Sequence, residues 1–164
     1  MIAAVVLAAG ASTRFGSPKQ QLLLPRVVER ARAGSVDDVV VVLGAHEVET
    51  DARVVRCPEW ERGPGASLRC GLEALSDETE AAVVVLADGP DLNPLAIDRV
   101  IADWRRDGGD ILAATYAGER SHPLLVARSA WAKIPDEGLR SLPATPVACD
   151  DLGHPGDVDT PADL

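Results

Sequence analysis

The sequence predicts an α/β protein, a Rossmann-like three-layer sandwich with a mostly parallel sheet. Short apolar runs rich in valine recur along the 164 residues, and helix-like stretches separate them. Because these runs do not alternate with polar residues, they are typical of strands buried on both faces. Strands that alternate with helices indicate a parallel sheet with right-handed crossovers on its two sides. No repeat, low-complexity tract or long linker divides the chain, so we expect one domain over residues 1–164.

The expected elements follow from these runs and from capping signals. Strands are predicted at Ile2–Leu7, Val39–Leu43, Ala82–Ala87, Ile111–Thr115 and Leu124–Ala127, with shorter ones at Arg53–Val55 and Pro146–Ala148. Helices are predicted at Arg26–Ala33, Ala66–Leu75, Pro94–Arg106 and Ser129–Ile134. The third helix is the best marked, since Asn93 can cap it and Pro94 suits its first turn. Thr160–Asp163 resembles the start of one more helix, which the sequence does not continue.

Composition excludes several classes of function. The net charge of −10 argues against a nucleic-acid surface, which needs clustered Lys and Arg. No apolar run is long enough to span a membrane, so a cytoplasmic protein is expected.

Cys57, Cys70 and Cys149 show neither zinc spacing nor a disulfide framework. We therefore expect them to be small core residues of a protein in a reducing compartment.

The segment after the first strand has the features of a phosphate-binding turn. Its small residues, Ala8, Ala9, Gly10 and Ala11, follow Leu7 directly, and they let a ligand approach the backbone amides. Ser12 comes next, and Arg14 and Lys19 add the cations that a triphosphate requires. The spacing fits neither the Walker loop nor the dinucleotide fingerprint. The alternative is a tight surface turn with solvated charges.

Carboxylates at two positions suggest a magnesium site. Asp88 ends the most apolar strand, so it should face the same crevice as the first turn. Mg²⁺ prefers one or two carboxylates together with phosphate oxygens and water. Asp157 and Asp159 flank Val158, and either could complete the site. The alternatives are a turn aspartate at Asp88 and an exposed acidic loop at the other two.

Two further segments are candidates for binding. Gly63–Gly71 is a glycine-bearing loop that enters a helix, whose free amides can hold an anion or the polar edge of a base. Ser67 could equally be the cap of that helix. His122 precedes Pro123 after an expected turn, and a single histidine is more often structural than catalytic.

These motifs, in this order, resemble the nucleotidyltransferases related to the molybdenum-cofactor enzymes, the MobA-like NTP transferases. The resemblance rests on the segments Leu7–Lys19, Arg56–Pro58, Gly63–Leu72, Leu86–Asp91, His122–Pro123 and Asp157–Pro161. It is strongest to the molybdopterin cytidylyltransferases. It implies the nucleotide-diphospho-sugar transferase fold and the transfer of CMP from CTP to a phosphorylated acceptor such as molybdopterin.

The resemblance also implies roles for particular residues. Asp88 would be the principal ligand of Mg²⁺, and one of Asp157 and Asp159 would assist it. Arg14 and Lys19 would act on the phosphates. The residues matching the loop over the base are Pro58, Gly65 and Ser67, and His122 would border the acceptor pocket.

The chain departs from the family pattern in three places. It lacks the short insertion near Leu24–Arg26, it leaves little room for a helix in Ala45–Ala52, and Gly89 replaces a bulkier polar residue. The last two could widen the site for a purine. A transferase that uses GTP or a sugar phosphate, or a nucleotide-binding protein without activity, therefore stays an alternative. We expect a monomer or a weak homodimer.

Overall fold

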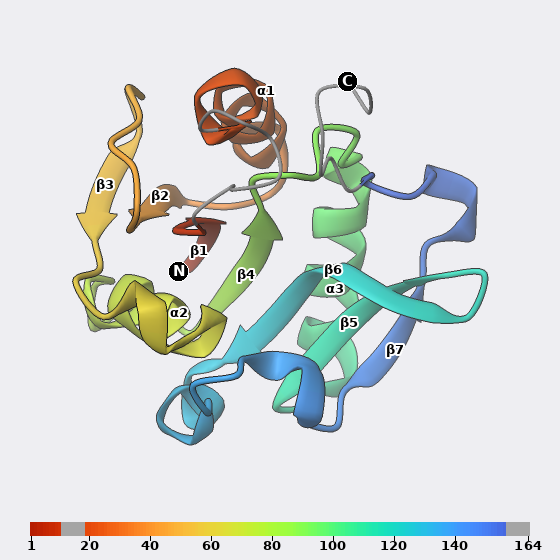
Figure 1. Ribbon diagram of the computed structural model, residues 1–164. Helices are drawn as coiled ribbons and strands as arrows, with labels where there is room; N and C mark the ends of the chain where they lie inside the picture. The colour runs from red at the N-terminus through yellow and green to blue at the C-terminus, as the bar shows by residue number, and fades with distance from the viewer. Residues whose placement is uncertain (11–18, 157–164) are drawn as a thin grey trace.

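A seven-stranded sheet forms the centre of the computed structural model, which describes residues 1–10 and 19–156 (Figure 1). The strand order is β3-β2-β1-β4-β6-β5-β7. The strands are β1 (Ile2–Ala8), β2 (Asp38–Leu43), β3 (Arg53–Arg56), β4 (Ala81–Leu86), β5 (Ile111–Tyr116), β6 (Glu119–Ala127) and β7 (Thr145–Ala148).

The sheet is mostly parallel, as the sequence predicts. β1 pairs in parallel with both β2 and β4, and the pairs β2–β3 and β5–β7 are parallel too. β6 is the exception, because it runs antiparallel to β4 and β5. The carboxyl ends of β1 and β4 therefore meet side by side, and the amino-terminal half of β6 passes beside them.

Helices and short helical turns cover both faces of the sheet and make three layers. α1 (Lys19–Ala33) and α3 (Pro94–Asp107) pack on one face, where their apolar residues join Ala4 and Val6 of β1. α2 (Pro64–Glu73) packs on the other face with Ala3 and Val5. Neighbouring residues of β1 are thus buried on opposite faces, which explains its unbroken apolar run. In the part of the chain that the structure describes, none of the helices combines the length and apolar character of a membrane span.

The helix boundaries differ from the prediction in three places. α1 begins at Lys19, seven positions before the predicted start, and keeps Pro25 inside it. Proline disfavours a helix interior, but the burial of Leu23, Leu24 and Val27 on the sheet outweighs this preference. α2 begins two residues early, at Pro64, and the stretch predicted as a helix at Ser129–Ile134 is a 3₁₀ helix over Arg128–Lys133.

The expected cap of α3 is confirmed. The side chain of Asn93 accepts a hydrogen bond from the backbone N–H of Leu95 at 3.0 Å, and Pro94 occupies the first turn. No helix forms between β2 and β3, as the shortness of Ala45–Ala52 predicts.

The expectation of three unpaired cysteines is wrong. Cys57, just after β3, is joined by a disulfide to Cys70 of α2, and only Cys149 is a free, buried thiol. The two residues lie 13 positions apart. Because α2 returns along the sheet beside the end of β3, the fold brings together two cysteines that no local motif connects.

Candidate functional site

The small-residue turn and Asp88 lie at the same edge of the sheet. Leu7 of β1 is in register with Leu86 of β4, and the backbone N–H of Ala87 donates to the carbonyl oxygen of Leu7 at 3.1 Å. Residues 8–10 and Asp88 therefore lie at the carboxyl ends of two neighbouring strands. Ala8 and Ala9 are buried, whereas Gly10 is exposed, so the backbone of the turn emerges where the strand ends.

A cavity of about 750 Å³ opens at this edge. Asp88 lines it together with residues from several other parts of the chain. They are Leu7 and Leu86 from the strand ends, Pro64 and Leu68 from α2, Val84 from β4, Arg120, Ser121, His122 and Leu124 from β6, Glu137–Ser141 from the loop before β7, and His154 and Gly156. A cleft at the carboxyl ends of parallel strands is the usual ligand position in open α/β sheets.

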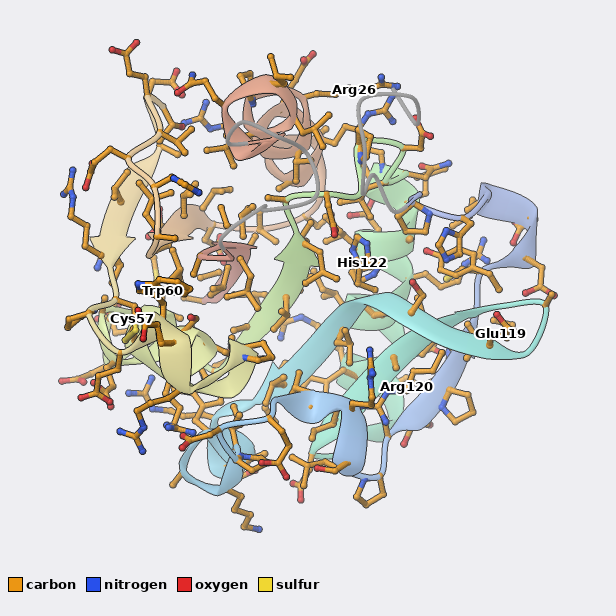
Figure 2. The ribbon with its side chains drawn as sticks, viewed as in Figure 1. Arg26, Cys57, Trp60, Glu119, Arg120 and His122 are labelled. Carbon is orange, nitrogen blue, oxygen red and sulfur yellow. A yellow bond between two sulfur atoms is a disulfide. The ribbon has the colours of Figure 1, made fainter. Side chains whose placement is uncertain are left out.

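His122 lies in the wall of this cavity. Its side chain is buried and its ring Nδ1 lies 3.4 Å from the backbone N–H of Leu86, which donates to it. Its carbonyl oxygen accepts a hydrogen bond from the hydroxyl of Tyr116 at 3.0 Å, and the His122–Pro123 peptide bond is cis. Figure 2 labels His122 and Arg120, which both belong to β6.

Gly89 allows this placement of the histidine ring. A Cβ atom at position 89 would lie 2.6 Å from both Cε1 and Nε2 of His122. The expectation that Gly89 widens the site is therefore wrong, since the imidazole of His122 occupies the space that a side chain would take.

Most lining residues were not identified as candidates from the sequence, and two of them, His154 and Arg120, make well-defined polar or ring contacts. The ring of His154 meets Tyr116 edge-on at 5.2 Å, and its Nδ1 accepts a hydrogen bond from the backbone N–H of Gly156 at 3.0 Å. Arg120 donates to the carbonyl oxygens of Leu139 and Leu142, each at 2.7 Å, and burial lowers its pKa. The one available signal was the position of His154 just before the Asp157 motif.

The amino-terminal turn of α2 forms the opposite wall, but not through the residues expected to contact the base. Pro64 and Leu68 line the cavity, whereas Gly65 and Ser67 are buried beside them and are absent from its lining. The alternative role for Ser67, as the cap of the helix, is not seen either, because the helix starts at Pro64 and Gly63 is its cap. Pro58 is exposed in the turn after β3.

Several expected site residues lie outside the described part of the chain. These are Ala11, Ser12, Arg14, Asp157 and Asp159, while Lys19 is the first residue of α1. Gly156, the residue before Asp157, lines the cavity.

The expected metal site depends on Asp88 alone within the described part of the chain, because Asp157 and Asp159 lie outside it. Within residues 1–10 and 19–156, no group of three or more His, Cys, Asp and Glu side chains is placed to hold a metal. Asp88 is a partly buried carboxylate at the cavity, and Glu137 is a second carboxylate in its lining. Mg²⁺ commonly takes one or two carboxylates and completes its shell with phosphate oxygens and water.

The protein is thus an α/β protein in which the ends of the parallel strands β1 and β4 lie beside one cavity, the position at which such sheets usually bind ligands. Residues 4–144 match the model of the MobA-like NTP transferase domain, and the chain belongs to this family.

Two curated relatives cover most of this chain. The chain is 31% identical over 143 residues to the bifunctional protein GlmU of Sorangium cellulosum, a match that covers 74% of this chain and 30% of that protein. It is 31% identical over 126 residues to a probable molybdenum cofactor guanylyltransferase of Chloroflexus aggregans, covering 71% of this chain and 59% of the relative. The chain thus spans less than two thirds of the length of these curated relatives.

Solved structures confirm the fold. A homologue of Rv0371c from Mycobacterium sp. strain JC1 superposes with a TM-score of 0.81 at 28% identity, covering 99% of this chain and 92% of that one. Rv0371c of Mycobacterium tuberculosis in complex with manganese gives 0.69 at 25% identity, with the same coverage. A nucleotidyl transferase from Methanothermobacter has a TM-score of 0.79 at 20% identity over 99% of this chain and 94% of that one, which supports the fold alone.

Proposed function

We propose that this chain is a divalent-metal-dependent nucleotidyltransferase that transfers a nucleoside monophosphate from a triphosphate to a phosphorylated acceptor. The observation that carries the proposal is the pairing of β1 with β4. The end of β1, which leads into the small-residue turn, lies beside the end of β4, and Leu7 and Asp88 both line one cavity. Membership of an NTP transferase family supports the same reaction.

The turn after β1 would hold the triphosphate. Its small residues leave the backbone amides accessible to phosphate oxygens, and Arg14 and Lys19 would add positive charge. An acceptor phosphate oxygen attacks the α-phosphorus in line, a new P–O bond forms, and the bond to the β-phosphate breaks to release pyrophosphate. The reaction needs no nucleophile from the protein, because positioning and charge neutralisation supply most of the catalysis.

Asp88 would hold Mg²⁺, with Asp157 or Asp159 as a further ligand. The bound cation would neutralise the charge that develops on the phosphates. A structure of Rv0371c with manganese, from a protein 25% identical to this chain, supports a divalent cation in the site.

The side of the cavity formed by β6 would receive the acceptor. His122 and Arg120 bring nitrogen donors to this side, and the loop of Glu137–Ser141 closes it. The molybdenum cofactor is a candidate acceptor, because one relative is named for it. We further propose a single domain that acts as a monomer or a weak homodimer.

For the base, we propose a preference for CTP over GTP. The sequence resembles the cytidylyltransferases most strongly, and the ring of His122 fills the space beside Gly89. An unpaired buried polar group on the wrong base costs about 1–3 kcal/mol. Thermal-shift measurements with Mg²⁺ and each triphosphate compare the four bases, since the tightest ligand stabilises the fold most at equal concentration. The largest shift with GTP would overturn the CTP preference and leave the transferase class standing.

Release of pyrophosphate tests the reaction itself. Each of the four triphosphates is mixed with Mg²⁺, the protein and a candidate phosphorylated acceptor such as molybdopterin. We expect acceptor-dependent pyrophosphate release that a chelator abolishes. If a triphosphate binds but no pyrophosphate is released with any acceptor tried, the result favours a nucleotide-binding protein without activity.

A further inference from the structure

The two walls of the cavity are joined outside it by one carboxylate, that of Asp136. Pro64 and Leu68 form one wall, and Glu137–Ser141 form the facing one. Asp136 precedes the second wall in the chain and is not among the residues that line the cavity. Its contacts all run to the segment that carries the first wall.

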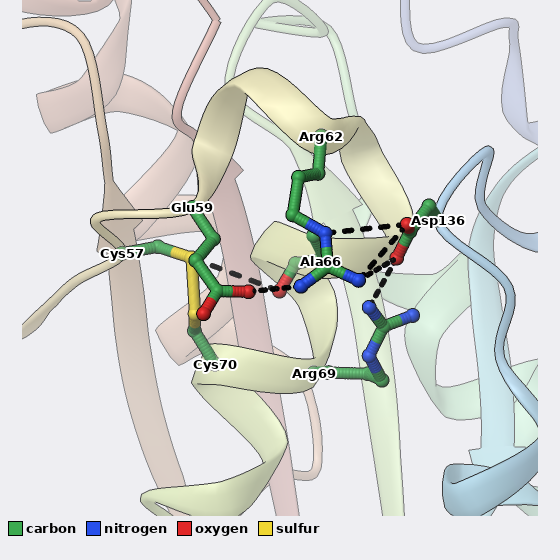
Figure 3. Close-up of a disulfide and its surroundings, with 7 residues drawn as sticks. All are labelled: Cys57, Glu59, Arg62, Ala66, Arg69, Cys70 and Asp136. Atoms are coloured by element: carbon green, nitrogen blue, oxygen red, sulfur yellow. Dashed lines mark hydrogen bonds and ion pairs between the residues drawn. A yellow bond between two sulfur atoms is a disulfide. The ribbon is translucent and has the colours of Figure 1, made fainter.

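Two arginines of that segment converge on Asp136 (Figure 3). Arg62 Nη2 lies 3.1 Å from Asp136 Oδ2, and Arg69 of α2 donates to Asp136 Oδ1. Arg69 also donates to the carbonyl oxygen of Ile134 at 2.6 Å. The hydrogen bond from Arg69, with that from Arg62, holds the pKa of Asp136 below its ordinary value, so the carboxylate is ionised at neutral pH.

The backbones of the two segments touch at the same point. The N–H of Gly65 donates to the carbonyl oxygen of Asp136 at 2.8 Å. A Cβ atom at position 65 would lie 1.7 Å from the carbonyl oxygen of Pro135, so no side chain fits there. The first turn of α2 and the segment 134–138 are thus fixed against each other by backbone contact and by charge.

We propose that Asp136 is a positioning residue that sets the separation of the two cavity walls and thereby the affinity for the nucleoside part of the substrate. This inference rests on the proposed function, in which the nucleoside lies against Pro64 and Leu68. The phosphates would lie instead at the turn after β1 and at Asp88, and among the described residues Asp136 is hydrogen-bonded to Arg62, Gly65 and Arg69 rather than to Asp88. Loss of the carboxylate charge therefore weakens binding of a nucleoside triphosphate and spares binding of pyrophosphate.

The test compares Asp136→Asn with the wild type and with Asp107→Asn. Asp107 pairs with Arg106 at 3.0 Å at the carboxyl end of α3, outside the cavity lining, so it controls for the loss of an exposed ion pair. Calorimetry in Mg²⁺ gives the dissociation constants of CTP, GTP and pyrophosphate for each protein. We expect Asp136→Asn to bind the preferred triphosphate roughly three- to tenfold more weakly, with unchanged pyrophosphate affinity, and Asp107→Asn to match the wild type.

Arg62→Gln gives a second measurement in case Asp136→Asn does not fold. It removes one partner of Asp136 and leaves Arg69 in place, so we expect a smaller loss that is again confined to the triphosphate. Equal losses for triphosphate and pyrophosphate, or no loss in either variant, would overturn the inference. A wild-type protein that binds none of the three ligands would overturn the proposed function together with it.

Discussion

The contact between Gly89 and His122 shows how a single missing side chain can determine the shape of a site. The ring of His122 lies against Gly89 and is held there by the backbone N–H of Leu86. The sequence identified both residues, but as separate features: a possible widening of the site and a possible acceptor contact. Their packing could not be predicted, because it depends on β6 running antiparallel beside β4, which no local pattern reveals.

Gly89→Ala should destabilise the protein by about 1–3 kcal/mol, since the new methyl group forces the buried imidazole or the backbone to move. Chemical denaturation measures the loss. Adding His122→Ala to Gly89→Ala should recover part of it, because the smaller side chain leaves room for the methyl group. Additive losses in the double variant would show that the two positions do not compete for the same space.

Arg14 and Lys19 are the two cations proposed to bind the phosphates of the triphosphate. Arg14→Ala and Lys19→Ala should each weaken CTP binding by about 1.5–3 kcal/mol, the value of a charge-assisted hydrogen bond, and leave cytidine binding nearly unchanged. Titration of each variant with CTP and with cytidine in Mg²⁺ checks this. Arg32→Ala is the matched control, because Arg32 of α1 pairs with Asp51 at 3.0 Å and does not line the cavity. Equal effects on CTP and cytidine would place the two cations away from the phosphates.

At the scale of the elements, burial made the strands easier to predict than the helix starts. β1, β2 and β4 lie within the sheet and are covered by helices on both faces, so their valine-rich runs identify them within one residue or two. α1 starts early because tertiary packing of its leucines overrides Pro25. β6 begins at Glu119, before its predicted start at Leu124, and its first residues are polar and include several that line the cavity. The apolar run that identifies a buried strand is therefore missing from this part of β6.

The Cys57–Cys70 disulfide joins the end of β3 to α2, and its removal should lower stability. We expect Cys70→Ser to reduce the free energy of unfolding by about 3 kcal/mol, the loop-closure value for a loop of roughly this length. Denaturation in the absence and presence of a dithiol reductant measures the effect. The reductant should destabilise the wild type and leave Cys70→Ser unchanged. A wild-type protein with the same stability in both buffers would contradict a disulfide contribution.

At the scale of the whole molecule, the parallel sheet accounts for the function that the sequence suggests. Six of the strands form parallel pairs and run in one direction, with β6 antiparallel between β4 and β5, so their carboxyl ends lie at the same edge of the sheet. The pair β1–β4 carries the two motifs of the proposed chemistry. The sequence predicted that these motifs share a crevice, because strand ends in such a sheet do so in general. It could not predict the facing wall at Glu137–Ser141, which is built from loop residues without a periodic pattern.

Turnover by Asp88→Ala, measured beside the wild type, tests the central claim most directly. Both proteins are assayed for pyrophosphate release over a titration of Mg²⁺, with CTP and a phosphorylated acceptor, after their unfolding curves have been compared. We expect the variant to fold normally, because Asp88 lies at a strand end at the cavity, and to lose activity by about a hundredfold or more, as when a metal ligand is removed. Normal Mg²⁺-dependent activity in a folded Asp88→Ala protein would contradict the account.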